Sequence, residues 1–312
     1  WIILMKSIVE NQKKEKAIEA GLAFRQAYNY SKGYKTALWG LTFLLAIVQF
    51  LAVLVDKNQI YGAYLEVFVV SILALYILLS SFGKARMRYW KDIGCKIQEL
   101  HDFYTLDVGN KPSKFALLPS LIQSLYKKRL RKNNEDILSF STWWSTNLEE
   151  IDFPRARLIC VYSTFSWELE LRKKYQFFLI TIISIGILIP IAISIVMNFT
   201  ARDIIIFGLV PIVPFISLVL EELLENIECI KTANSIRTDS CHVWDNVLDN
   251  RLNVEDINSK TIELMSRWQI YRLMTLPIFE WLYKLTQQKM NNEMLVNTDS
   301  LIEEVKELDN SI

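Results

Sequence analysis

Histidine, glycine and proline are scarce in this sequence of 312 residues, which contains 2 His, 9 Gly and 7 Pro. Neither His101 nor the group of Cys241, His242 and Asp245 has the four-ligand spacing of a zinc site. The sequence also contains no glycine-rich phosphate loop, no GxSxG elbow and no HExxH motif. We therefore expect no metal site, no cofactor and no catalytic centre.

Disulfides and a strong net charge are not expected either. The 4 cysteines form no CxxC pair, and all of them lie in segments that we assign below to the reducing cytoplasm. The 35 Lys and Arg residues are balanced by 34 Asp and Glu residues. That balance excludes the global basic surface that proteins binding duplex DNA carry.

Long apolar runs, in contrast, are abundant, and 52% of the residues are hydrophobic. A transmembrane helix needs roughly 20 apolar residues to cross ~30 Å of hydrocarbon. Four runs are long and apolar enough, and we predict that each forms a transmembrane helix. They are Ala37–Val55, Ile60–Phe82, Phe177–Phe199 and Ile204–Leu220.

Short polar links join these runs into two antiparallel hairpins, and the distribution of Lys and Arg sets their orientation. There are 7 such residues before the first run, 17 between the hairpins and 9 after the fourth run, against 1 in each link. Both links are therefore predicted to be external and both termini cytoplasmic. The predicted organisation is a cytoplasmic N-terminal helix (1–36), a first hairpin (37–82), a cytoplasmic helical segment (83–176), a second hairpin (177–220) and a cytoplasmic C-terminal helical segment (221–312).

The cytoplasmic segments have helical spacing and few strand signals. We therefore predict an all-α polytopic membrane protein with four transmembrane helices in two hairpins and a cytoplasmic helical module. Asp152 followed by Pro154 is typical of a helix start. This helix is expected to continue without a break into the third apolar run, as a rigid lever.

The segment before the third run carries the most distinctive motifs of the sequence. They are Trp143–Trp144, Pro154, ARLIC at Ala156–Cys160, Trp167–Glu168 and LRKKY at Leu171–Tyr175. FRQAYNYSK (Phe24–Lys32) and QIYRLMTLPIFEWLYK (Gln269–Lys284) add one motif on either side. Together with the paired apolar runs, these motifs resemble the SMODS-associated four-transmembrane effectors (S-4TM) over nearly the whole chain. The chain departs from that pattern at residues 161–162 and 286–288, where Val-Tyr and Thr-Gln-Gln replace residues that include an expected Arg.

The resemblance implies an effector of cyclic-oligonucleotide-based anti-phage signalling (CBASS). In such systems a CD-NTase-like nucleotidyltransferase makes a cyclic di- or trinucleotide, and the effector binds that messenger and disrupts the membrane. It thus implies a multi-pass protein of the bacterial inner membrane in contact with the lipid bilayer. Four spans per subunit are too few for a wide pore, so we expect a homo-oligomer such as a tetramer.

Such a messenger needs cations for its phosphates and flat surfaces for its bases. Arginine can donate two hydrogen bonds to a phosphate, and base stacking on an aromatic ring contributes roughly 1–3 kcal/mol per base. The basic residues could instead satisfy the positive-inside rule, and the aromatic residues could form an interfacial belt or core. The candidate ligand-binding residues are Arg155, Arg157, Tyr162, Trp167, Arg172, Trp268, Tyr271 and Arg272, with a smaller third set at Arg25 and Tyr28.

Candidate pore or gating residues lie in and after the apolar runs. Glu66 is an ionisable residue in the second run, where a functional role competes with a position among the headgroups. Gln49 could hydrogen-bond between helices. Pro211 and Pro214 are expected to bend the fourth run, as is Pro190 in the third. Beyond the fourth run, Glu221 and Glu225 lie on one helix face, which either forms carboxylate rings at a pore mouth or is simply solvated.

Two other functions fit the same sequence. A ligand-gated ion channel without a defence role would show selective conductance and no toxicity. A non-conducting membrane scaffold would bind a protein partner through its cytoplasmic helices and have no affinity for a small molecule.

Overall fold

The computed structural model of the chain describes residues 7–55, 62–108, 117–132, 135–198 and 200–311. Within these ranges the chain is helical and forms no strand, so the all-α prediction is confirmed. The elements are α1 (Ile8–Lys13), α2 (Glu15–Val55), α3 (Gly62–Leu106), α4 (Pro119–Lys132), α5 (Glu135–Ser141), the 3₁₀ turn η2 (Thr146–Glu150), α6 (Phe153–Val196), α7 (Ala201–Asp203), the π-helical η3 (Ile204–Leu209), the 3₁₀ turn η4 (Val210–Ile212), α8 (Val213–Leu248), α9 (Val254–Met274) and α10 (Glu280–Ser311).

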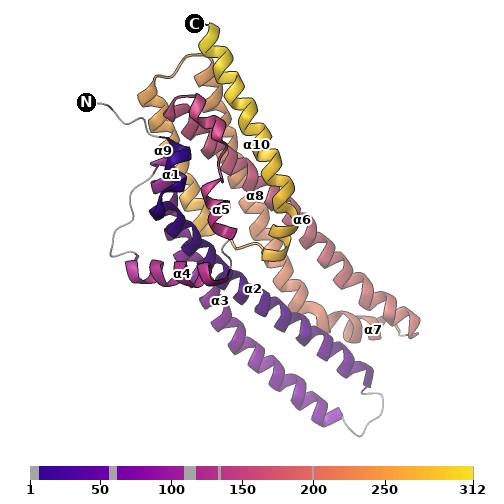
Figure 1. The fold of residues 1–312 in the computed structure, drawn as a ribbon. Coiled ribbons are helices and arrows are strands. Elements are labelled where there is room, and N and C mark those ends of the chain that lie inside the picture. Colours follow the sequence, from indigo (N-terminus) through magenta and orange to yellow (C-terminus); the bar gives the residue numbers. More distant parts are fainter. Residues whose placement is uncertain (1–6, 56–61, 109–116, 133–134, 199, 312) are drawn as a thin grey trace.

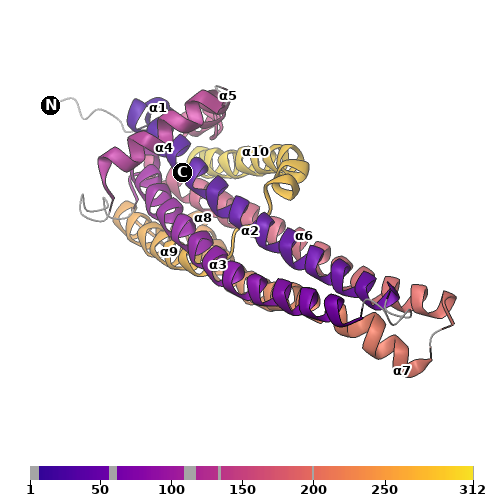
Figure 2. The ribbon, with the colours of Figure 1, turned by 90° about the horizontal axis from the view of Figure 1, so that it is seen from below.

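Four long helices give the molecule its elongated shape (Figures 1 and 2). α2 packs along α3, and α6 packs along α8. The helices α1, α4, α5, α9 and α10 gather around one half of these pairs and form a helical module, whereas α7 lies at the opposite end (Figure 1). The opposite ends of the two pairs project away from this helical module.

Apolar side chains cover the outside of the projecting half. Phe177, Val196 and Leu78 are 74%, 80% and 71% exposed, although large apolar side chains of a water-soluble protein gather in its core. Among the described residues, the segments Val70–Leu106 and Phe153–Val196 are long and apolar enough to cross a membrane. The count of four spans and their orientation stay predictions, and the first link, 56–59, lies outside the described residues.

α6 is one uninterrupted helix, as the sequence predicts. Its N-cap, Asp152, accepts a hydrogen bond from the backbone N–H of Arg155 at 3.3 Å, and Pro154 stands in the first turn, where a missing N–H costs nothing. The helix continues through Pro190 to Val196 over 44 residues, a length of about 66 Å at ~1.5 Å per residue. It therefore joins the helical module to the projecting half as one element.

The fourth apolar run corrects the expectation of a regular helix over Ile204–Leu220. The chain there is π-helical in η3, forms a 3₁₀ turn in η4, and becomes α-helical only from Val213. Pro211 lies in η4 and Pro214 in the first turn of α8. Since proline has no N–H to donate to the residue four positions earlier, two prolines this close together interrupt the α-helical ladder.

The core of the helical module surrounds the middle of α6. The last three residues of its ARLIC motif and the residue after it have no exposed surface; they are Leu158, Ile159, Cys160 and Val161. α8, α9 and α10 all pack against α6, so this stretch is enclosed on every side. Burial raises the pKa of the Cys160 thiol well above its ordinary value. The motif that most characterises the sequence is therefore a packing element.

Candidate functional site

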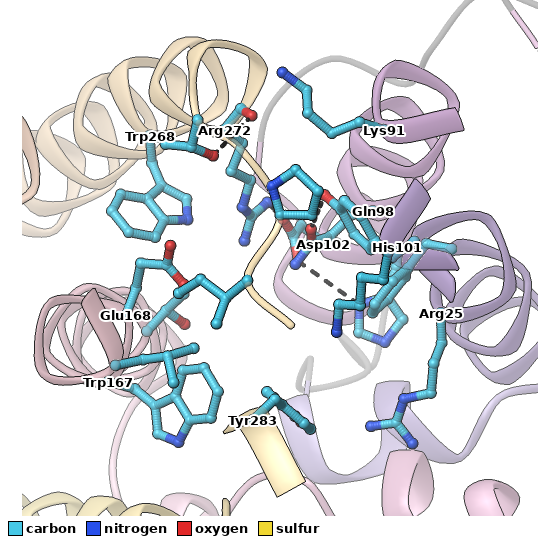
Figure 3. A pocket seen from close by; sticks show the side chains of 18 of the residues that line it. Arg25, Lys91, Gln98, His101, Asp102, Trp167, Glu168, Trp268, Arg272 and Tyr283 are labelled. Atoms are coloured by element: carbon cyan, nitrogen blue, oxygen red, sulfur yellow. Dashed lines mark hydrogen bonds and ion pairs between the residues drawn. The ribbon is translucent and has the colours of Figure 1, made fainter. Parts of the chain in front are cut away.

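A cavity of about 240 Å³ lies inside the helical module between α2, α3, α6, α9 and the link from α9 to α10. Basic and aromatic side chains from segments far apart in the sequence converge on it (Figure 3). The α9–α10 link (residues 275–279) forms one wall through four of its residues. The lining comprises Phe24, Arg25, Tyr28, Asn29, Lys32, Lys91, Gln98, His101, Asp102, Thr105, Phe140, Trp143, Trp144, Thr164, Trp167, Glu168, Leu171, Arg172, Trp268, Arg272, Thr275, Leu276, Pro277, Ile278, Glu280, Tyr283 and Met294.

Arg272 on α9 and Asp102 on α3 form a buried ion pair across one side of the cavity. Their side chains are 9% and 10% exposed. Burial acts to raise the pKa of Asp102, but the Arg272 guanidinium and a hydrogen bond from His101 outweigh it, and the pKa lies below its ordinary value. Asp102 is therefore a carboxylate, and its negative charge balances the positive charge of the Arg272 guanidinium at the cavity.

A second arginine, Arg172 on α6, is held in the same way. Its Nε donates to Glu168 one turn earlier at 2.8 Å, and its Nη2 donates to the carbonyl of Leu276 at 3.0 Å. Burial alone would lower the pKa of this guanidinium, but the charge of Glu168 raises it above the ordinary value. Arg172 thus connects the lever helix to the α9–α10 link and keeps its full charge in a buried position.

α2 supplies two more cations, each paired with a carboxylate and lying over a ring. Arg25 meets Asp136 at 2.9 Å and lies 4.5 Å from the centre of the Phe140 ring. Lys32 meets Glu280 at 2.6 Å and lies 4.9 Å from the Tyr283 ring. Burial lowers the pKa of Lys32, while Glu280 acts to raise it.

Two tryptophans line the cavity beside these cations. Trp268 is 2% exposed and stacks on Tyr271 at 4.5 Å between ring centres. Its indole Nε1 has no hydrogen-bond partner in the part of the chain that the structure describes, and Figure 3 shows this edge of the ring turned toward the centre of the cavity. Trp167 packs against Tyr283 and donates from Nε1 to Asn291 at 3.2 Å. A buried, unpaired N–H that faces a cavity is a donor available to a ligand.

The α9–α10 link and the turn before it are held by cations from three long helices. Lys91 of α3 donates a hydrogen bond to the carbonyl of Leu273, and Arg172 of α6 donates one to the carbonyl of Leu276. Lys35 of α2 donates to the carbonyl of Pro277 at 2.7 Å. The wall of the cavity is therefore hydrogen-bonded directly to the helices that enter the projecting half.

Lys35 also belongs to a buried polar cluster where that half begins. Its side chain is 1% exposed and meets Glu222 of α8 at 2.7 Å. Tyr175 of α6 accepts from Lys35 at 2.8 Å and donates to Glu222. Trp39 of α2 donates to Glu222 at 2.8 Å. Burial lowers the pKa of Lys35, while the Glu222 charge acts to raise it.

The structure separates the predicted ligand-binding residues into two groups. Trp167, Arg172, Trp268 and Arg272 all line the cavity, together with the third set, Arg25 and Tyr28. The other four do not. Arg155 pairs with Asp309 at 2.8 Å, Arg157 donates to the carbonyl of Asp107 at 2.9 Å and to Asn258, Tyr162 lines a smaller groove that includes Met290 and Met294, and Tyr271 donates to Glu168 at 3.3 Å.

Sequence reasoning missed several lining residues, above all the acidic ones. Asp102 and Glu280 had no signal in the sequence, because single carboxylates in charged helices are common. His101, at the edge of the cavity beside Asp102, was considered only as a metal ligand. Lys91 follows the second apolar run by nine positions and is indistinguishable in sequence from other cytoplasmic lysines.

The predicted pore residues lie elsewhere, and their role stays a prediction. Gln49 is half-buried in α2, and the side chain of Glu66 in α3 lies outside the described residues. Pro211 is buried. Glu221 is exposed and meets Lys84 at 3.2 Å. Burial, followed by the charges of Glu221 and Glu222, raises the pKa of the half-buried Glu225.

Comparison with known proteins places this arrangement in a family. The model of the SMODS-associating 4TM effector domain matches residues 6–301. No curated protein and no solved structure matches the chain. Among the described residues, no group of three His, Cys, Asp or Glu side chains could hold a metal ion.

Proposed function

The chain belongs to the SMODS-associating 4TM effector domain family, and on that premise we propose that its cavity binds a cyclic oligonucleotide and that binding opens or assembles a membrane pore. The family places the chain among membrane-associated effectors of anti-phage signalling linked to SMODS nucleotidyltransferases. We further propose that the protein spans the bacterial inner membrane four times, has both termini in the cytoplasm and acts as a homo-oligomer such as a tetramer.

The observation that supports binding is the pairing of cations with flat indole surfaces in one buried space. Arg172 and Arg272 lie on different helices, α6 and α9, and both line the cavity beside Trp268. Each guanidinium is held by a carboxylate, Glu168 or Asp102. A phosphodiester would compete with those carboxylates for the same planar donors. Ligand entry would therefore rearrange existing ion pairs, and it would give the free Trp268 N–H an acceptor.

In the proposed mechanism, the α9–α10 link transmits the rearrangement of the ion pairs to the helices that enter the membrane. Arg172 is bonded to Leu276 at 3.0 Å, and the next carbonyl, that of Pro277, is bonded to Lys35 at 2.7 Å. Lys35 stands two positions before the first predicted span, and its partner Glu222 stands two positions after the fourth. A shift of the link thus changes the contacts of α2, α6 and α8 at the level where they enter the bilayer.

The energy required is within reach of such a ligand. Shifting a two-state equilibrium from 1:99 to 99:1 needs ~5.5 kcal/mol of differential binding. If a tetramer opens in one concerted step, each site contributes about 1.4 kcal/mol of that total. A single base stack, at roughly 1–3 kcal/mol, covers this share.

Dye leakage from liposomes that contain the purified protein tests the proposal. A panel of cyclic di- and trinucleotides is added, with linear nucleotides as controls, and one cyclic member is expected to trigger release. Selective conductance triggered by another ligand would favour a channel without a defence role. No leakage and no nucleotide binding by a folded, inserted protein would favour the scaffold.

Two substitutions on α9 connect leakage to this cavity. Trp268→Phe keeps an aromatic ring against Tyr271 but removes the free N–H, and should weaken messenger binding about 3- to 10-fold, the equivalent of one hydrogen bond. Arg267→Gln is the matched control, because Arg267 forms an exposed pair with Asp239 at 2.7 Å outside the cavity. Equal messenger affinity in both variants would remove the cavity from the proposal.

A further inference from the structure

The first two turns of α10 lie at the height where the long helices enter the projecting half. The Trp281 ring is 5.1 Å from the ring of Phe178, the second residue of the third apolar run. Immediately before α10, the Phe279 ring is 4.9 Å from Trp39, the third residue of the first run. The start of α10 is thus level with the first turns of two predicted membrane spans. From there α10 runs away from the projecting half toward the C-terminus (Figure 1).

These turns expose large apolar side chains on one side. Trp281 is 46% exposed and Leu285, four residues later, is 76% exposed. Residues four apart on a helix share a face, so the two form one apolar strip. The side of α10 that faces the protein is formed by other residues: Leu282 and Met290 are 9% and 2% exposed and belong to the core, and Tyr283 packs against it. The strip is therefore a second, outward-facing apolar surface.

Charge along α10 changes sign with distance from this end. The exposed residues Lys284 and Lys289 flank the apolar strip. Beyond them the exposed charged positions of the helix are acidic, at Glu293, Glu303, Glu307 and Asp309. An apolar strip containing Trp and flanked by Lys is typical of a helix that lies in the interfacial layer of a bilayer, and basic residues there are attracted to anionic lipids.

We propose that residues 280–289 of α10 form a lipid-binding surface that lies in the headgroup layer of the membrane. Trp281 and Leu285 enter the interface, and Lys284 and Lys289 contact anionic headgroups. This inference rests on the proposed placement of the helical module against the membrane but does not require messenger binding or pore opening. It also gives the α9–α10 link a second anchor, because the link continues directly into this surface.

Fluorescence of an environment-sensitive label tests the contact. In the full chain with Cys241→Ser, which removes the most exposed cysteine, the label is attached to Leu285→Cys or, as the matched control, to Val296→Cys. Val296 is 69% exposed on the same helix, about 16 Å further along its axis. Each protein is reconstituted in two kinds of nanodisc, one of phosphatidylcholine alone and one that also contains roughly 30% phosphatidylglycerol. Phosphatidylglycerol is anionic, and anionic lipids attract basic segments.

The expected result is contact between position 285 and shallow lipid. A label there should be quenched by lipids spin-labelled near the headgroup and protected from aqueous iodide, and the effect should increase in the anionic nanodiscs. The label at position 296 should be quenched by aqueous iodide and not by the spin-labelled lipids. The Lys284→Glu substitution should reduce the lipid quenching at position 285.

Three outcomes would overturn the proposal. Equal iodide quenching at both positions would place the strip in water. Protection of position 285 from both iodide and lipid quenchers would assign the strip to a protein partner. Identical quenching in neutral and anionic nanodiscs would remove the role of anionic headgroups. Because leakage and nucleotide binding play no part in this assay, failure here is distinguishable from failure of the proposed function.

Discussion

Glu221 and Glu222 are neighbours in α8 with opposite surroundings, and replacing each by Gln compares an exposed ion pair with a buried one. Glu222 meets Lys35 at 2.7 Å with side chains 7% and 1% exposed, and it also accepts a hydrogen bond from Trp39. Glu221 meets Lys84 at 3.2 Å with side chains 53% and 41% exposed. Both changes keep the size of the side chain and remove one charge.

The expected losses of stability differ several-fold. Removing one partner of a buried pair costs roughly 3–5 kcal/mol, because the remaining charge is left uncompensated. Removing one partner of an exposed pair costs about 0–1 kcal/mol. At about 2–4 °C per kcal/mol for a large domain, Glu222→Gln should lower the melting temperature by on the order of 10 °C. Glu221→Gln should change it by a few degrees at most, on the order of 2 °C.

Thermal melting of the purified protein in detergent, followed by intrinsic tryptophan fluorescence, measures both variants. The double variant Lys35→Met with Glu222→Gln adds an internal check. It removes both charges and leaves Gln as an acceptor for Trp39, but it also removes the Lys35 hydrogen bond to Pro277, so it should recover part of the lost stability. Equal shifts for Glu221→Gln and Glu222→Gln, or a double variant no more stable than the single one, would refute the reasoning.

Three further substitutions test other parts of the structure. The pKa of Glu225 is raised in the folded protein, so ionisation of this carboxyl group opposes folding once the pH rises above its ordinary pKa of 4.5. Glu225→Gln should therefore increase the melting temperature at pH 7. Melts recorded at falling pH should show this gain disappear below about pH 4.5. Gly21→Ala should destabilise the module, because a Cβ there would lie 2.8 Å from the Phe140 ring; Gly33→Ala, with open space around its Cβ, is the control in the same melting assay. Asp152→Ala should cost about 0.5–2 kcal/mol by removing the α6 N-cap, whereas Asp152→Asn, a good cap itself, should cost less in denaturant unfolding; equal losses would exclude the capping bond as the cause.

The candidate site shows where sequence reasoning is limited. The sequence identified arginines and tryptophans as the relevant chemistry, and Arg172, Arg272, Trp167 and Trp268 do meet around one cavity. Arg155, which fits the same chemical criterion, instead forms an ion pair with Asp309 near the C-terminus. Nothing in local composition distinguishes these arginines, because each also has a partner more than 100 positions away in the chain: Asp309 for Arg155, Asp102 for Arg272 and the Leu276 carbonyl for Arg172.

The sequence by itself determined the helical class, the apolar runs and the start of α6. Hydrophobic periodicity, the length of each apolar run and an Asp-Phe-Pro start are all local features, which can be read from one continuous stretch of sequence. The prolines of the fourth run also acted locally, by removing N–H groups from the helical ladder. Only the tertiary structure decided which charges are buried together. Lys35 and Glu222 are separated by 187 positions, and their contact depends on how α2 packs against α8. Packing of this kind is fixed by the complementary shapes of whole helices, and short sequence patterns do not carry that information.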